Sequence, residues 1–130
     1  MNRRLTLDWV AVAAVVEVTS GLVLIIRPSL FVWLLFGAEL PAAGRALGRL
    51  AGFAVLALAL ACWPGVAAEA RAAPRALLAF SLFTTIYLIY LGVRGEPVGI
   101  LLWPVAILHG ALMVLLGHNL KLLRDHSSAE

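Results

Sequence analysis

Charged residues are scarce in this sequence, and that scarcity decides its class. Only 13% of the 130 residues are charged, whereas 63% are hydrophobic, and the mean hydropathy is +1.01. A soluble domain needs a charged surface to stay dispersed, and this chain has too few charges to make one. The composition therefore predicts an integral membrane protein, with lipid in place of water around most of the chain.

The sequence also lacks the residues of several kinds of site. Its one cysteine, Cys62, can form neither an internal disulfide nor a metal site alone. The three histidines make no metal-binding pattern, since His109 and His118 are nine residues apart and would face different sides of a helix. No glycine-rich phosphate loop or nucleophile elbow occurs. We therefore expect no metal site, and no residue is singled out as catalytic.

The excess of positive charge is small and has a simple explanation. The formal net charge is +3 and the sequence pI is about 9.8, values that also occur in nucleic-acid-binding proteins. Here the basic residues stand mostly at the ends of apolar segments, where they orient a membrane protein. We expect the lipid bilayer, and not nucleic acid, to be the partner of these charges.

Four apolar segments have the length of a membrane span, which takes about 20 helical residues. The first follows Arg3 and Arg4, a start that resembles a signal peptide. Its apolar run is too long for one and contains Glu17, so we expect a retained helix. The sequence predicts an all-α four-helix bundle in a single membrane domain, residues 1–130, with helices at about 7–26, 41–63, 74–91 and 98–117.

A fifth apolar segment, residues 29–37, is too short to cross a bilayer. We predict a short interfacial helix here, capped by Ser29 and ended by Gly37. The alternative is a continuation of the first helix that is kinked at Pro28.

The positions of Lys and Arg predict the orientation of the spans. One side carries Arg3, Arg4, Arg71, Arg75, Lys121 and Arg124, and the other carries Arg27, Arg45 and Arg94. Arg49 is left out because it lies within a predicted span. Since the more basic side faces the cytoplasm, we expect both termini there, in a bacterial inner membrane. The amphipathic stretch 118–125 is expected to rest on the inner leaflet.

Each predicted span carries a polar side chain at a similar depth. Glu17 lies nine residues before the end of the first helix, which is about 13 Å at 1.5 Å per residue and close to the middle of a core about 30 Å thick. His109 has a comparable depth in the fourth helix. The other candidates are Arg49 in the second helix, and Thr84 and Tyr87 in the third. Ionisable residues at this depth are costly in lipid, so they indicate a candidate ligand-binding site or polar cavity.

Glu17 and Arg49 are predicted to pair, directly or through water, because their helices are antiparallel neighbours and a guanidinium needs an acceptor. Two interpretations stay open. The pair fixes the helix register and has no further role, or it shapes a cavity in which Tyr87 and His109 offer hydrogen bonds to a ligand. His109 also has an ordinary explanation as a hydrogen-bonded core histidine.

Small residues four apart form a stripe on the second helix: Gly44, Gly48 and Gly52. Such a stripe lets another helix approach closely, so it is predicted to mediate packing within or between subunits. Four spans make a thin bundle. We therefore expect a homo-oligomer or a complex with a partner membrane subunit.

The segment Glu17–Pro28 (EVTSGLVLIIRP) resembles the first helix of the DoxX-like small bacterial membrane proteins, in which a glutamate precedes a glycine and an aliphatic run. The segment 48–52 (GRLAG) looks like the glycine-bearing second helix of the same group. The resemblance covers about half of the chain and implies a four-helix bundle. It implies little about activity, since some members of the group are linked to quinone-dependent oxidation and others to the assembly of partner proteins.

Ala14–Val18 is also similar to the membrane glutamate site of the small multidrug resistance transporters, which are four-helix chains of comparable size. Two departures weaken this comparison. Arg49 would neutralise the glutamate, and the third span lacks the tryptophan-centred pattern of those transporters.

The leading functional hypothesis is a non-catalytic, accessory membrane protein. Its polar site would bind a small amphipathic molecule such as a quinone or a lipid, or would dock a partner helix. The alternative is a proton-coupled small-molecule exporter in which Glu17 exchanges protons and cations. A third hypothesis is a membrane enzyme or redox subunit that uses Tyr87 and His109 beside a quinone.

Overall fold

The computed structural model describes residues 2–64, 72–94 and 98–127, and all regular structure in these ranges is helical. The helices are α1 (Asn2–Ile26), α2 (Pro28–Phe36), α3 (Ala42–Ala61), α4 (Ala72–Val93) and α5 (Leu102–Ser127). All except α2 are long and apolar enough to cross a membrane. The prediction of an all-α, four-span membrane protein with a short additional helix is confirmed.

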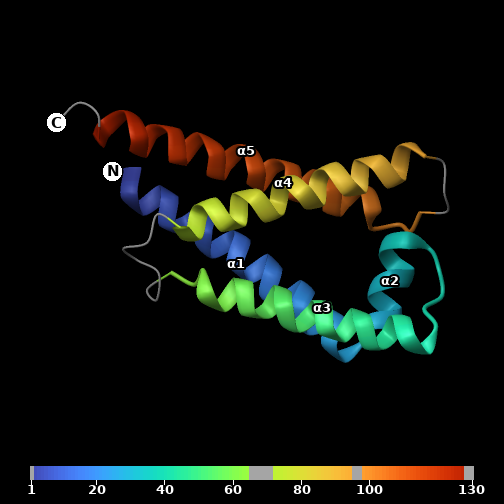
Figure 1. Cartoon of the computed structure of the whole chain (residues 1–130). Helices are drawn as coiled ribbons and strands as arrows, with labels where there is room; N and C mark the ends of the chain where they lie inside the picture. Colours follow the sequence, from blue (N-terminus) through green and yellow to red (C-terminus); the bar gives the residue numbers. More distant parts are fainter. Residues whose placement is uncertain (1, 65–71, 95–97, 128–130) are drawn as a thin grey trace.

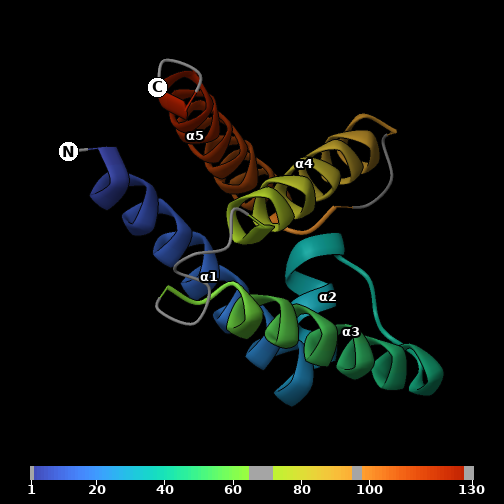
Figure 2. The ribbon, with the colours of Figure 1, turned by 60° about the vertical axis from the view of Figure 1, so that its left-hand side comes forward.

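The four long helices run alternately up and down and form two pairs (Figure 1). In one pair α3 packs along α1, and in the other α4 packs along α5. The pairs meet where α1 contacts α5 and, less extensively, α4. Both termini lie at one end of the bundle and α2 lies at the other, as Figures 1 and 2 show from two directions. Within the described residues α3 has no comparable contact with α4 or α5.

The pair α1–α3 is held together by a close approach of two glycines. A Cβ added to Gly52 would lie 2.8 Å from the Gly21 carbonyl oxygen, and one added to Gly21 would lie 3.0 Å from the Gly52 carbonyl oxygen. The first distance is shorter than real Cβ contacts, and the second is tighter than most of them. The two backbones can therefore cross here only because both positions lack a side chain, as small residues permit in membrane helices.

Helix α2 is a separate nine-residue element and not a kinked extension of α1. Arg27 leaves the helical conformation (φ −135°, ψ 61°) between the two helices, and Pro28 takes the first position of α2, where its missing N–H costs nothing. The predicted cap at Ser29 is wrong, because Arg27 is the capping residue and makes no side-chain cap bond. The predicted stop at Gly37 is confirmed, since this residue adopts the left-handed conformation (φ 64°) that ends many helices.

The carbonyl end of α2 is bonded to the segment that precedes α5. The backbone N–H of Gly99 donates to the Leu35 carbonyl (3.1 Å), and that of Leu101 donates to the Leu34 carbonyl (2.9 Å). These bonds satisfy carbonyls that a helix end otherwise leaves without partners. Helix α2 thus ties the first helix pair to the second at the end opposite the termini.

Helix α5 is longer than predicted. It was expected to end near Gly117 and to be followed by a separate amphipathic stretch at 118–125, but one continuous helix runs from Leu102 to Ser127. Asn119 is buried in this helix and its side-chain amide donates to the Leu115 carbonyl (2.7 Å). Gly117 is therefore an interior helix residue and not a terminator.

Candidate functional site

Along the length of the bundle, the interior consists of a polar level between two apolar levels. The apolar cluster at the end with the termini, called here the terminal cluster, consists of Val10, Ala13, Cys62, Ala73, Leu77, Leu112 and Leu116. The apolar cluster at the α2 end, called here the α2 cluster, consists of Leu35, Leu88, Leu102 and Ala106. Between them lie four buried polar residues, called here the polar layer: Glu17, Ser81, Thr85 and His109.

Helix periodicity places each member of the polar layer on the buried face of its helix. On α5, His109 follows Ala106 by three residues and precedes Leu112 by three. On α1, Glu17 continues the buried positions Ala13 and Ala14. Residues three or four apart share one helix face, so the polar side chains replace apolar ones at a single level of an otherwise apolar core.

Glu17 and His109 face each other across the contact between α1 and α5. The Oε1 atom of Glu17 lies 3.7 Å from the Nδ1 atom of His109, which is longer than a hydrogen bond. The two residues are only 1% and 4% exposed. Within the described part of the chain, neither of these two atoms has a hydrogen-bond partner. Such orphaned polar atoms are rare in protein interiors and costly, so they require an explanation.

Helix α4 supplies the rest of the layer. Thr85 donates its hydroxyl hydrogen to the Ser81 carbonyl one turn earlier (2.7 Å). Phe80 lies edge-on to the His109 ring, with 6.0 Å between ring centroids. The methyl group of Thr85 would lie 3.7 Å from a Cβ at Gly110, which places the Thr85 side chain next to the backbone beside His109.

A carboxyl group beside an imidazole can share or exchange a proton. The pair carries no net charge when both groups are neutral, and none when the proton has passed from Glu17 to His109. Either state avoids a lone charge in the membrane, which would be expensive. Both groups also accept and donate hydrogen bonds, so the pair can receive a hydroxyl or a carbonyl group of another molecule.

Arg49 does not join this site. Its Nε donates to the Ile25 carbonyl at the end of α1 (3.3 Å), and its side chain is exposed. Ile25 lies eight residues from Glu17, about 12 Å along the helix. The predicted contact between Glu17 and Arg49 is therefore not formed, and His109 takes the place beside Glu17 that Arg49 was expected to fill.

Thr84 and Tyr87 are also outside the polar layer. Tyr87 is 57% exposed and lies on the outer face of α4, while Thr84 is only partly buried. On the buried face of α4, Ser81 and Thr85 carry the hydroxyl groups that face inward, and neither was predicted as a site residue. Their signal is the spacing Leu77, Ser81, Thr85, Leu88, which places two small hydroxyl residues within a regular apolar face.

The glycine stripe of α3 contacts the end of α1 and the chain that follows it. Gly52 crosses Gly21, while a Cβ on Gly48 would lie 3.0 Å from the Cβ of Pro28. Gly44 lies beside Leu40, in the segment before α3. All three glycines thus pack within the chain.

The polar layer differs from ordinary helix packing in two ways. It contains ionisable groups that are almost fully buried at a depth where lipid surrounds the bundle, and its two facing atoms make no hydrogen bond among the described residues. The layer is assembled from three helices, so no contiguous sequence motif encodes it. No protein-family model, curated protein or solved structure matches this chain.

Proposed function

We propose that this chain is an accessory membrane protein whose polar layer binds the polar head of a small, lipid-soluble molecule, either a quinone or a lipid. The observation that carries the proposal is the facing pair of orphaned atoms, Glu17 Oε1 and His109 Nδ1. A buried polar atom without a partner costs about 1–3 kcal/mol. A ligand oxygen within hydrogen-bond distance of both atoms would remove that cost.

The surroundings of the pair define the chemistry of such a ligand. Apolar side chains of the terminal cluster and the α2 cluster lie on either side of the polar layer. A ligand that enters must therefore be mostly apolar and must carry one or two oxygen atoms, as in a quinone carbonyl, a quinol hydroxyl or a lipid ester. Binding sites of this kind are generally apolar with a few placed polar groups.

Entry to the layer requires a small separation of helices, because Glu17 and His109 are covered on all sides. Among the contacts that α1 makes with the other long helices, the one with α4 is the least extensive. We propose that the ligand enters from the lipid between these two helices. The aromatic side chains Phe83 and Tyr87 are exposed on α4 and do not belong to the polar layer.

The test is native mass spectrometry on protein extracted gently from its own membrane. The wild-type chain should carry a small molecule of discrete mass. Glu17→Gln and His109→Gln keep side chains of similar size but remove one member of the pair, and each should lower the retained fraction about tenfold, as expected for the loss of one hydrogen bond to a charged or strongly polar group. Tyr87→Phe, on the outer face of α4, is the matched control and should leave the fraction unchanged.

Two results would overturn the proposal. If the wild-type chain carries no small molecule, the pair has a structural role instead. It then fixes the register of α1 against α5, as buried polar pairs do in some proteins. Equal loss of the molecule in the Tyr87→Phe control would show that it is bound to the outer surface.

A second function is favoured by the position of Arg49. One of the two departures from the exporter pattern was that this arginine would neutralise Glu17, and the bond from Arg49 to the Ile25 carbonyl removes that one. Glu17 beside His109 can change its protonation state. In the same preparation, an exporter would release protons from the detergent-solubilised protein when a cationic substrate is added, and Glu17→Gln would abolish the release.

We further propose that the chain is DoxX-like, that it acts as a homo-oligomer or with a partner membrane subunit, and that it lies in a bacterial inner membrane. The segment 17–28 and the four-helix architecture support the first point. Many large apolar side chains are exposed on the isolated chain, among them Leu47, Leu50 and Phe53 on α3, which leaves room for a partner as well as for lipid. The oligomeric state in the same mass spectra tests the second point.

A further inference from the structure

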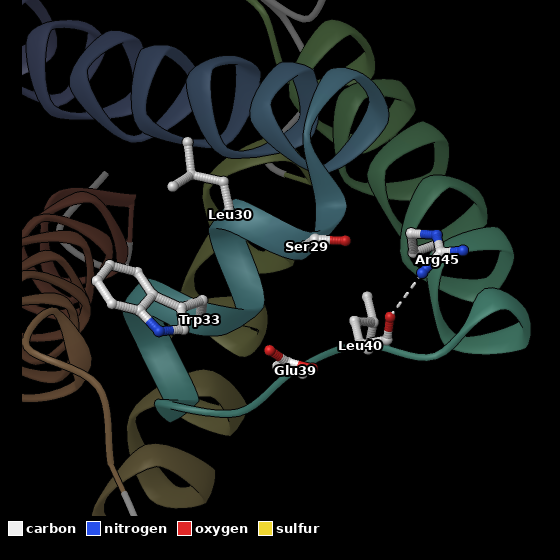
Figure 3. A pocket seen from close by; sticks show the side chains of 6 residues that line it. All are labelled: Ser29, Leu30, Trp33, Glu39, Leu40 and Arg45. Atoms are coloured by element: carbon white, nitrogen blue, oxygen red, sulfur yellow. Dashed lines mark hydrogen bonds between the residues drawn. The ribbon is translucent and has the colours of Figure 1, made fainter.

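A second, separate site lies at the α2 end of the bundle, where α2 meets the start of α3. A hollow of about 480 Å³ opens there, lined by Ser29, Leu30, Trp33, Glu39, Leu40 and Arg45. Figure 3 shows Trp33 on one side of the hollow and Arg45 on the other, with Ser29 and Glu39 between them. Its volume is within the range of small-molecule sites.

The hollow contains a positive and a negative group that do not neutralise each other. Arg45 donates through Nη1 to the Leu40 carbonyl (2.9 Å), and this single bond leaves most of its guanidinium hydrogens unused. Glu39 is exposed and makes no salt bridge within the described residues. The lining thus offers one donor group for an anion and one acceptor group for a cation, which do not pair with each other.

The position of the hollow matches the boundary between lipid and water. Arg45 lies in the first turn of the span Ala42–Ala61, and α2 follows directly after the span Trp9–Ile26. Trp33 is exposed, and tryptophan at the end of a span is typical of the head-group level of a bilayer. Leu30 lies on the same lining and offers an apolar surface to the glycerol and the first methylene groups of a lipid.

We propose that this hollow binds the head group of an ethanolamine phospholipid. The phosphate would accept hydrogen bonds from the guanidinium of Arg45 and the hydroxyl of Ser29, since arginine and phosphate form strong charge-assisted bonds. The ammonium group would donate to the Glu39 carboxylate and lie against the Trp33 ring, which attracts cations. One head group would satisfy both charges of the site.

The charge of Glu39 distinguishes this ligand from other phospholipids. Phosphatidylglycerol, which has a net negative charge, carries a neutral glycerol in place of the ammonium group, so it would place a hydroxyl beside the carboxylate and form no ion pair there. The choline head group carries a cation that cannot donate a hydrogen bond. An ethanolamine head group therefore fits the lining best.

The experiment uses the full-length chain in detergent, delipidated and then titrated with phosphatidylethanolamine, phosphatidylcholine or phosphatidylglycerol of equal acyl composition. Native mass spectrometry counts the bound lipids. The wild-type chain should bind the ethanolamine lipid about tenfold more tightly than the other two, the lower end of what one additional hydrogen bond between charged groups provides.

The variants separate the two halves of the head group. Glu39→Gln, a change in an exposed segment, should remove the preference for ethanolamine while leaving general phospholipid binding. Arg45→Gln should lower the affinity for all three lipids. Arg45→Lys keeps the positive charge and should therefore retain part of that affinity. Arg94→Gln is the matched control, because Arg94 lies at the same end of the bundle, stacked on Tyr90 (5.1 Å) and outside the hollow.

Three outcomes would overturn the proposal. Equal affinity for the three lipids would exclude head-group recognition, and equal effects of Arg45→Gln and Arg94→Gln would indicate attraction by net charge alone. The third outcome concerns free phosphoethanolamine, added as a competitor of the bound lipid. If it displaces the lipid at millimolar concentration, the site is one for a soluble zwitterion and not for a membrane lipid.

Discussion

Gly99 is the residue at which the fold has the least room for a side chain. A Cβ at this position would collide with the carbonyl oxygens of Leu34 and Trp33. Both obstacles are backbone atoms of α2, which cannot turn away as a side chain can. Gly99→Ala should therefore displace α2 from the segment before α5 and lower the free energy of unfolding by about 1–3 kcal/mol, as overpacking does elsewhere.

The measurement is unfolding of the purified chain by increasing fractions of denaturing detergent, followed by helical circular dichroism. Gly117→Ala is the control, since its Cβ would meet only Leu78 Cδ1 at 3.9 Å. Alanine is the better helix former by about 1 kcal/mol, so this variant should be as stable as the wild type or more so. If the Gly99→Ala and Gly117→Ala chains unfold at the same fraction of denaturing detergent, the close contact between Gly99 and α2 is refuted.

At single residues the sequence predicts which polar groups lie within a span better than it predicts how groups on different spans are placed against one another. The position of Glu17 within its span follows from counting residues, and so does that of His109. Which of the polar groups at one level meet each other depends on how each helix is rotated about its axis. Arg49 was expected at a depth close to that of Glu17, but the register of α3 against α1 places its Nε beside the Ile25 carbonyl, about 12 Å along α1 from Glu17. The partner of Glu17 therefore could not be selected from depth alone.

Four elements pack together at Cys62, just beyond the end of α3. In the terminal cluster its buried side chain lies among residues of α1, α4 and α5. Burial also raises the pKa of the Cys62 thiol. Since the thiolate is the reactive form, a raised pKa leaves less of it at a given pH, and the rate of alkylation should rise only at higher pH than for an exposed cysteine.

We predict that Cys62 reacts with a small maleimide about tenfold more slowly than an exposed cysteine, because the helices must open locally first. The matched comparison is Ala72→Cys in a Cys62→Ala background, at an exposed position at the same end of the bundle. Mass spectrometry of the alkylated protein gives both rates. Similar rates at neutral pH would mean that the terminal cluster is open. Denaturing detergent should make the two rates equal.

The elements themselves were largely predictable because hydrophobic length is a direct signal. The second span was predicted to start at residue 41, and α3 starts at Ala42, one residue later. Pro41 signals this start, because proline is common at the beginning of helices. The end of α5 was missed at Gly117. A glycine inside a helix costs only about 1 kcal/mol, and the buried Asn119, three residues after the buried Leu116, continues the packed face. Glycine alone is thus a weak sign of a helix end.

At the scale of the whole molecule, the polar layer lies at the joint between the two helix pairs. Glu17 belongs to the pair α1–α3, whereas Ser81, Thr85 and His109 belong to the pair α4–α5. Within the described residues the other connections between the pairs are the two apolar clusters and the bonds of α2. A proton or a ligand at the layer therefore acts where one pair contacts the other, and two packed bodies can shift at such a contact.

The orientation of the bundle determines which leaflet the phospholipid hollow faces. Both termini lie at one end and α2 at the other (Figure 1), so an orientation with cytoplasmic termini would place the hollow at the outer leaflet. The test in a bacterial host is a pair of fusions. A fluorescent protein after Glu130 should fluoresce, because it folds in the cytoplasm, and alkaline phosphatase fused after Ala38 should be active, because it needs the periplasm.

The exchanged pair of reporters is the control, with phosphatase after Glu130 and the fluorescent protein after Ala38, and both of these fusions should be inactive. An active phosphatase after Glu130 would show that the bundle has the opposite orientation, with both termini in the periplasm. The excess of Lys and Arg on the side of the termini, which fixes orientation in most multi-span proteins, would then have failed to do so here. Glu39 and Arg45 would instead face cytoplasmic lipids, and the same hollow would select its head group from the inner leaflet.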